Sequence, residues 1–185
     1  MTDLDFIREF TNNDLPLQDD KTEYLTCNSL LKGYVGPRSC GKTYLLYQDL
    51  VCNAFHNKGD YLVLAPNFPT LLSIRIYVSQ CLDQFALSMT EIETSFCHTV
   101  CRLPNKSTVT FAASSSDALI YIGNKRYDIV YIDEPQHIRN FEEVIETFTP
   151  VVQFYNGYIG VFGTIDAMFY EYLIAKGFDL THHLD

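Results

Sequence analysis

Eight consecutive residues near the start of the chain have the types and spacing needed to hold a phosphate chain. They are Gly36, Pro37, Arg38, Ser39, Cys40, Gly41, Lys42 and Thr43, which fit the pattern of glycine, four residues, then glycine-lysine-threonine. Glycines let a backbone curl so that successive N–H groups point at phosphate oxygens. Lys42 can reach the β- and γ-phosphates, and the Thr43 hydroxyl can ligate Mg²⁺. The loop therefore predicts a site for a nucleoside triphosphate, with Mg²⁺ as its companion ion.

The segments on either side of this loop are those that such a site requires. Residues 30–35 are mostly apolar and predict a short strand before the loop. Residues 44–51 predict a helix after it, whose positive N-terminal end would face the same anion. A plain glycine turn would not need this strand-loop-helix context.

A second group of polar residues follows an apolar strand over residues 127–132. Asp133 at its carboxyl end can orient Mg²⁺ and its waters, and Glu134 can act as general base on an attacking water. A further strand over 158–162 ends in Gly163 and Thr164. A polar side chain at that tip could touch the γ-phosphate and report its loss, or the pair could be an ordinary strand-to-helix turn.

The rest of the chain alternates strand and helix patterns. Such a series predicts an α/β fold with a mostly parallel central sheet, right-handed crossovers and helices on its faces. Alternating residues around Pro104 and Asn105 predict a β-hairpin. The other expected segments are a helix to about residue 56, a strand over 61–65, a helix over 70–85, hairpin arms at 94–100 and 107–111, a loop over 112–116, a helix over 140–148 that ends before Pro150, and a final helix over 167–176.

Length and charge limit the number of domains and the type of partner. The 185 residues suffice for one α/β domain, which we place at 27–185, after a polar, partly helical extension over 1–26. In that extension Gln18 or Tyr24 could contact adenine, or the segment could simply lie on the surface. The net charge of −10 argues against a surface that wraps nucleic acid as a whole, so any DNA contact must be local. No secretory signal or membrane span is predicted, which favours an intracellular protein.

Taken together, these features resemble the ATPase domain of the large terminase subunit, the DNA-packaging motor of tailed phages and herpesviruses. The resemblance covers about residues 30–164 and rests on Arg38 inside the loop, the hairpin strand that runs into Ala113-Ser114-Ser115, the 129–134 strand and Gly163-Thr164. The Pro-Arg-x-x-Gly-Lys-Thr form of the loop makes the herpesvirus branch the nearest. The resemblance implies a P-loop NTPase of the RecA-like, additional-strand, glutamate-containing class (ASCE), with a β-hairpin insertion.

The resemblance also implies roles for single residues. Lys42 and Thr43 would bind the phosphates of ATP and Mg²⁺, Asp133 would hold Mg²⁺, and Glu134 would activate water. Arg38 would contact the γ-phosphate or act as an arginine finger, in cis or in trans.

Gly163 and Thr164 would match the family's coupling motif, which links hydrolysis to movement of the part that grips DNA. Two features depart from the family pattern. Residues 123–126, Gly-Asn-Lys-Arg, stand where an Arg-Gly pair is usual, which leaves the role of Arg126 open. No nuclease domain follows Asp185, so either the chain is an excised ATPase domain or cutting resides elsewhere.

The implied partners are double-stranded DNA, further copies in a homo-oligomeric ring, the portal and capsid, and other terminase subunits, with no membrane. A virus-encoded protein of this kind would work in the host nucleus if it is herpesvirus-like and in the cytoplasm otherwise. Lys106, Lys125 and Arg126 could contact DNA phosphates, although they could equally be solvated surface charges.

Two other functions remain open at this point. Asp133-Glu134-Pro135-Gln136 resembles the Asp-Glu-x-Gln signature of another group of viral P-loop helicases, but a helicase needs a second motor domain. The third hypothesis is a nucleotide-binding assembly or switch protein that does not turn over ATP. The presence of Glu134 argues against it, because a switch needs no base there.

Overall fold

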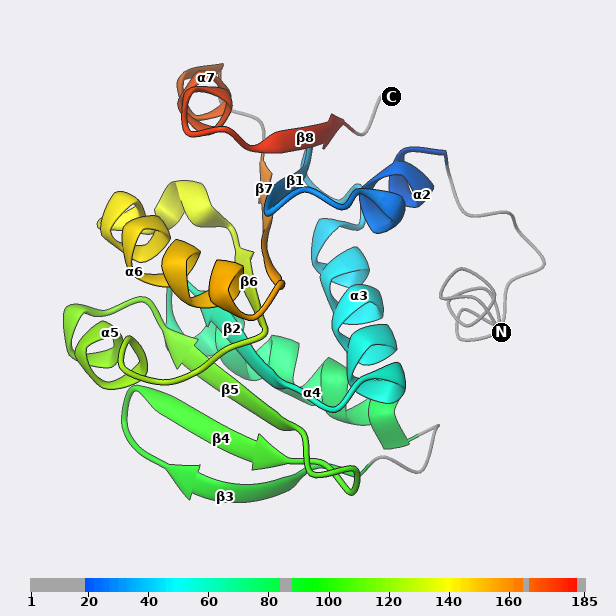
Figure 1. Ribbon diagram of the computed structural model, residues 1–185, viewed down its shortest axis with the longest axis vertical. Coiled ribbons are helices and arrows are strands. Elements are labelled where there is room, and N and C mark those ends of the chain that lie inside the picture. Colours follow the sequence, from blue (N-terminus) through cyan, green and yellow to red (C-terminus); the bar gives the residue numbers. More distant parts are fainter. Residues whose placement is uncertain (1–18, 84–87, 165–166, 183–185) are drawn as a thin grey trace.

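The computed structural model describes residues 19–83, 88–164 and 167–182. In this part of the chain eight strands form a single sheet in the order β3-β4-β5-β2-β6-β7-β1-β8 (Figure 1). The strands are β1 (Leu31–Gly36), β2 (Asp60–Ala65), β3 (Thr90–Thr94), β4 (His98–Arg102), β5 (Thr108–Ala113), β6 (Ile129–Asp133), β7 (Tyr158–Thr164) and β8 (Asp179–His182). Residues 1–18 of the predicted extension, Gln18 included, lie outside the described residues.

Six neighbouring strands, from β5 to β8 in the sheet order, run parallel, and β4 and β3 continue the sheet antiparallel beyond β5. The predicted mostly parallel sheet with a β-hairpin insertion is therefore confirmed. All six carboxyl ends of the parallel strands meet at one edge, where α/β proteins bind ligands.

Helices cover both faces of this sheet (Figure 1). They are α2 (Asp19–Thr26), α3 (Lys42–His56), α4 (Phe68–Asp83), α5 (Ser116–Ile122), a short 3₁₀ turn η1 (Pro135–His137), α6 (Phe141–Phe154) and α7 (Ala167–Ala175). α3 and α4 share one apolar core with the sheet, whereas α5, α6 and α7 contribute to a second core on the opposite face. The predicted helices after the phosphate loop and after β2 are confirmed.

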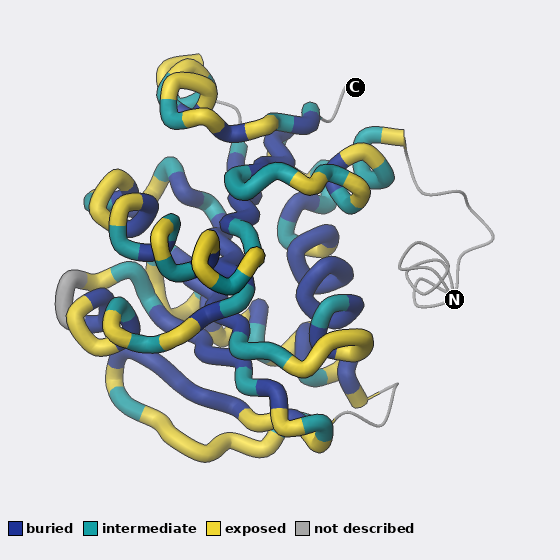
Figure 2. Tube along the Cα trace, viewed as in Figure 1, coloured by how far each residue is buried: buried dark blue, intermediate teal, exposed yellow. Residues whose placement is uncertain are grey.

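Period-two alternation along the buried strands assigns their side chains to these two cores. In β2, Val63 packs into the α3–α4 core and its neighbour Leu64 into the α5–α6 core. Both faces are covered here, so the central strands β2 and β6 are buried almost throughout, which explains their nearly continuous apolar sequences (Figure 2).

The hairpin was predicted correctly, but the bounds of its first arm were wrong. β4 and β5 pair through the turn at Pro104-Asn105, as expected. However, the predicted arm over 94–100 contains a turn after Thr94, and a further strand, β3, precedes it. Every residue of β3 is exposed, so the strand has no apolar alternation from which to predict it. The predicted loop over 112–116 is also shorter, because Ser115 caps α5 through its side chain.

The helix after residue 140 does not end before Pro150, contrary to prediction. α6 continues through this proline to Phe154. Its apolar side chains keep helical spacing on both sides, and Phe148 and Val152 are both fully buried. Pro150 itself is exposed, so water can satisfy the carbonyl that loses its helical partner.

Both ends of the described chain pack onto the sheet. Tyr24 on α2 is fully buried and its ring contacts Tyr34 and Phe162, so the interpretation of this residue as a surface or adenine-contacting side chain is wrong. Near the other end of the described chain, β8 pairs with β1. Among the described residues, no helix has both the length and the apolarity that a bilayer span would need.

A buried polar network ties α3 to the strands beneath it. Asp49 on α3 accepts hydrogen bonds from Tyr158 (2.6 Å), Tyr24 (3.3 Å) and Asn53 (2.9 Å), and Lys32 on β1 lies 3.8 Å away. Lys32 and Asp49 are 2% and 5% exposed. Each charge is thus held by the other and by aromatic and amide groups, which offsets the cost of burial. The network fixes the helix that begins at the phosphate loop.

We predict that Asp49→Ala lowers the free energy of unfolding by about 3–5 kcal/mol, because it leaves the Lys32 ammonium buried without its counter-ion. Chemical denaturation monitored by circular dichroism measures this change. Asp83→Ala, at an exposed position near the end of α4, serves as the control and should change stability by less than about 0.5 kcal/mol. Equal effects of the two substitutions would contradict this account of the network.

Candidate nucleotide-binding site

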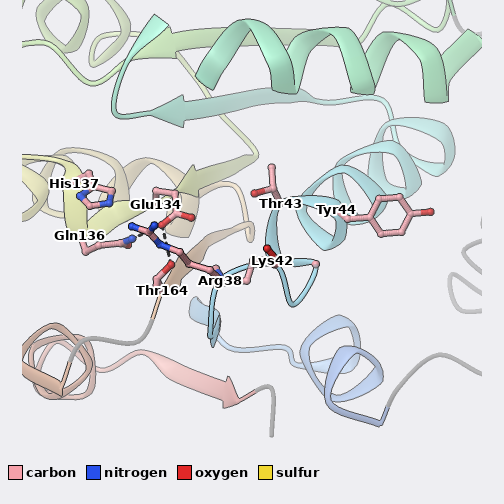
Figure 3. Close-up of a pocket in the computed structure, with 10 residues that line it drawn as sticks. Arg38, Lys42, Thr43, Tyr44, Glu134, Gln136, His137 and Thr164 are labelled. Carbon is pink, nitrogen blue, oxygen red and sulfur yellow. Dashed lines mark hydrogen bonds between the residues drawn. The ribbon is translucent and has the colours of Figure 1, made fainter. Parts of the chain in front are cut away.

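A cavity of about 700 Å³ lies at the carboxyl edge of β1, β7 and β6 (Figure 3). Its lining comes from the phosphate loop and the start of α3, from the turn after β6 and from the tip of β7. The residues are Arg38, Ser39, Gly41, Lys42, Thr43, Tyr44, Glu134, Gln136, His137 and Thr164. Residues separated by more than one hundred positions in the chain therefore meet in one cleft.

The backbone of the phosphate loop has the curled form that the glycine pattern predicts. Gly41 has φ of 87° and Ser39 has φ of 66°, both in the left-handed region. A side chain at position 41 would be strained at that φ, which explains the glycine. α3 begins directly after Gly41, and its first helical hydrogen bond runs from the Leu45 N–H to the Gly41 carbonyl. The N-terminal end of α3, with its unpaired N–H groups, is thus presented at the cavity.

Lys42 is held in the curl of the loop by backbone oxygens. Its Nζ donates to the Pro37 carbonyl at 2.6 Å and to the Gly36 carbonyl at 3.2 Å, and the residue is only 5% exposed. These carbonyls keep an ammonium group at the loop without a carboxylate partner among the described residues. A phosphate oxygen would supply the negatively charged partner for this ammonium group.

Thr43 and Asp133 bring two oxygen atoms together between β6 and α3. The Thr43 hydroxyl donates to Asp133 Oδ1 at 3.1 Å, and Asp133 is 2% exposed. Burial, followed by the neighbouring charge of Glu134, raises the pKa of Asp133 to about 7. A buried carboxylate with so little compensation, beside a hydroxyl oxygen, is the kind of donor pair that Mg²⁺ prefers. The residues present therefore fit the predicted ion.

Glu134 points into the same cavity from a constrained backbone. Its φ of 47° and ψ of 54° place it in the left-handed region, and its N–H donates to the Phe162 carbonyl at 2.8 Å. Such a conformation is costly for a residue other than glycine and is retained where the surroundings enforce it. The Thr164 hydroxyl donates to Glu134 Oε2 at 3.3 Å, so the tips of β6 and β7 are in direct contact.

Register places the tip of β7 beside the phosphate loop as well. Thr164 pairs with Gly36, and Asp133 pairs with Phe162, so β7 lies between the strand of the loop and the strand of the carboxylates. Figure 3 shows the Arg38 side chain extending from the loop in the direction of Glu134 and Thr164. The geometry thus assembles most of the residues that the sequence predicted for this site. Cys40 has a half-buried thiol and lies 3.9 Å from Lys42 Nζ.

Comparison with known protein families gives one match, over residues 34–147, to the family described as terminase large subunit, T4-like virus type, N-terminal. This match spans more than half of the 185 residues. The chain belongs to this terminase family. A search of curated proteins found no match.

Solved structures of phage large terminases have the same fold. The large terminase ATPase domain of Thermus phage P74-26 is 17% identical in sequence, with a TM-score of 0.65 over 96% of this chain and 84% of that one. The large terminase of another phage, a thermophilic bacteriophage, is 11% identical, with a TM-score of 0.65 over 91% of this chain. A structure of this second phage protein in complex with ATP-γ-S matches with a TM-score of 0.62 and 12% identity over 90% of this chain and 44% of that one.

These comparisons correct the branch that the resemblance indicated. The family is of the T4-like phage type and the structures compared above come from phages, so the herpesvirus branch and a nuclear location are not supported. The Pro-Arg form of the phosphate loop was too short a signal to separate the two branches. This terminase chain spans 46% of the length of the second phage's large terminase.

Three residues of the cavity were not predicted as site residues. Tyr44 follows Thr43 in the first turn of α3, and in Figure 3 its ring points away from Glu134. Gln136 and His137 lie in η1, directly after Glu134. Gln136 could have been found from the Asp-Glu-Pro-Gln sequence, whereas nothing in the sequence marks the exposed His137.

The cations considered for DNA contact differ in their surroundings. Lys125 lies 3.8 Å from Glu93, and Arg126 donates to Asp128 at 2.9 Å. Lys106 lies in the β4–β5 turn and has no ion pair within the described ranges. Lys125 and Arg126 are thus already partly neutralised by acidic neighbours.

The buried carboxylate of Asp133 leads to a testable pH dependence of stability. Its folded pKa of about 7 lies above its unfolded value, so deprotonation disfavours the folded state as pH rises. Asp133→Asn removes this cost, and without divalent cations we expect it to stabilise the protein by about 2–4 kcal/mol at pH 8 and by little at pH 4. Thermal unfolding in EDTA at several pH values measures the difference. Asp19→Asn, at an exposed position, is the control, and a pH-independent gain for Asp133→Asn would contradict the assignment.

Proposed function

We propose that the chain is the ATPase motor of a phage large terminase, which hydrolyses ATP to drive double-stranded DNA into a capsid. The observation that carries this proposal is the meeting of Lys42, Thr43 and Glu134 in one cleft, with Thr164 on the strand between them. Asp133 lies directly behind this lining, bonded to the Thr43 hydroxyl. Membership of the terminase family and the phage structures of the same fold support it.

The residues of the phosphate loop and of the Asp133-Glu134 pair each have a role in the proposed reaction. The loop N–H groups from Gly36 to Thr43 and the Lys42 ammonium bind the phosphates of ATP. Thr43 and Asp133 would hold Mg²⁺, which neutralises phosphate charge when bound. Glu134 orients the attacking water and accepts its proton. Arg38 stabilises the charge that develops on the γ-phosphate, in its own subunit or in a neighbour.

Gly163 and Thr164 form the link between hydrolysis and movement. Thr164 touches Glu134 and belongs to a strand that is hydrogen-bonded to both β1 and β6. Loss of the γ-phosphate changes the charge in the cleft next to Thr164. This change therefore acts directly on β7, and β7 transmits it to the neighbouring strands β1 and β6. We place this motor domain at 27–185, with residues 1–26 as an extension in front of it whose helix α2 packs against the domain through Tyr24.

The partners follow from the packaging reaction. DNA would contact a few local cations, because the net charge of −10 disfavours a broad nucleic-acid surface. Further copies in a ring, a portal, a capsid and the other terminase subunits complete the proposed machine, and its location is the cytoplasm of the infected host cell.

The two rival functions have less support. A helicase reading rested on Asp133-Glu134-Pro135-Gln136, and the family match places this sequence in a terminase instead. A switch that does not turn over ATP would not need Glu134 in the cavity beside Thr164, held by two donors. Turnover distinguishes the switch from the motor.

The first test is steady-state ATP hydrolysis in the presence of Mg²⁺ and double-stranded DNA. We expect Glu134→Gln to lower kcat by at least about 100-fold while ATP binding is retained, because the amide cannot accept the proton. Lys42→Ala should instead weaken ATP binding, since it removes the ammonium that pairs with phosphate. Equal ATP binding by wild type and Glu134→Gln, with no hydrolysis by either, would favour the switch over the motor.

A further inference from the structure

We infer that Gln136 is a positioning residue for the general base, which holds the Glu134 carboxylate so that one of its oxygens faces the reacting water. The inference rests on the proposed ATPase function. It concerns a residue outside the phosphate loop, the Asp133-Glu134 pair and the β7 tip.

The hydrogen bonds of Glu134 are unevenly divided between its two oxygens. Gln136 Nε2 and the Thr164 hydroxyl both donate to Oε2. No hydrogen bond from another described residue reaches Oε1. Two donors from different elements, η1 and β7, therefore hold Oε2 in place, and the second oxygen stays available to accept a proton.

The amide of Gln136 is itself held in one orientation. Its Nε2 must face Glu134, because only the NH₂ group can donate to a carboxylate. Its Oε1 is then buried, and it has no donor among the described residues. A buried amide oxygen without a partner is costly, so the arrangement is retained for a reason other than stability.

Gly163 supplies the space in which this amide lies. A Cβ atom built at Gly163 would come within 3.0 Å of Gln136 Oε1 and 3.2 Å of Pro135 Cδ. A Cβ at this position would require the amide or the Pro135 ring to shift by a few tenths of an ångström. Glycine at this strand tip is thus explained by the close approach of η1, and the β7 tip and the base are connected through Gln136.

The left-handed backbone of Glu134 makes such a support necessary. The sharp turn into Pro135 and η1 directs the Glu134 side chain into the cleft, where Thr164 and Gln136 are its two hydrogen-bond donors among the described residues. A proton-accepting oxygen must be held within hydrogen-bond reach of the water for efficient transfer. Gln136 acts on the rate through Glu134 and does not contact the phosphates in this account.

The test measures kcat, KM for ATP and the Kd for ADP of wild type, Gln136→Leu and Glu134→Gln, together with the double variant, with Mg²⁺ and double-stranded DNA present. Leucine removes the donor and approximately keeps the volume. We expect Gln136→Leu to lower kcat by about 10- to 100-fold, with KM and Kd changed less than twofold. Adding Gln136→Leu to Glu134→Gln should lower the residual rate no further, because the amide then has no base to position.

Gln153→Leu is the matched control, since Gln153 is exposed near the end of α6 and distant in sequence from the cleft. Gln136→Ala is the second variant in case leucine prevents folding, which thermal unfolding of each protein would reveal. It should lower kcat in the same way, because it also deletes the donor.

The outcomes distinguish a failure of this inference from a failure of the proposed ATPase function. Wild-type hydrolysis that depends on Glu134 but is unaffected by Gln136→Leu and Gln136→Ala would overturn the positioning role and leave the ATPase intact. An additive loss in the double variant, or a rise in KM equal to the fall in kcat/KM, would also overturn it. Absence of hydrolysis in wild type would refute the ATPase function and the inference together.

Discussion

The hydrogen bonds of β7 to β1 on one side and to β6 on the other determine the geometry of the whole site. β1 leads into the phosphate loop and β6 ends in Asp133, so the width of one strand separates the residues that bind phosphate from those that act on water. Strands in a sheet lie about 4.8 Å apart, which leaves the two groups roughly 10 Å from each other at their backbones. Side chains bridge this gap. The Thr43 hydroxyl reaches Asp133, and the Thr164 hydroxyl at the tip of β7 reaches Glu134.

Two buried carboxylates show how the fold treats charge differently in its core and in its cleft. Asp49 receives donors from two tyrosines and an asparagine and has Lys32 beside it, so its charge is compensated inside the protein. Asp133 is equally buried but receives a single hydroxyl donor, and burial raises its pKa to about 7. The first arrangement holds α3 in place. The second leaves a charge unsatisfied at the place where a cation would satisfy it.

The turn after β6 concentrates the backbone strain of the site. Glu134 adopts a left-handed conformation, Pro135 begins a 3₁₀ turn, and the glycine at position 163 makes room for that turn. Natural proteins tend to break local rules at functional sites, where the surrounding structure stabilises the exception. Here the exception directs the Glu134 side chain toward the cleft and brings Gln136 against it.

The sequence by itself determined the fold class, the phosphate loop, the Asp133-Glu134 pair and the order of most strands and helices in the core, although not α5 or β8. These features depend on local chemistry: the glycine spacing, period-two and period-3.6 apolar patterns, and polar residues at strand ends. Only the tertiary structure placed β7 between β1 and β6, buried Tyr24 and Lys32, extended α6 through Pro150 and brought Gln136 to Glu134. Those results depend on contacts between residues far apart in the chain. Burial and register, which such contacts set, decide whether a proline is tolerated, whether a charge is paired and whether an exposed strand such as β3 pairs with another.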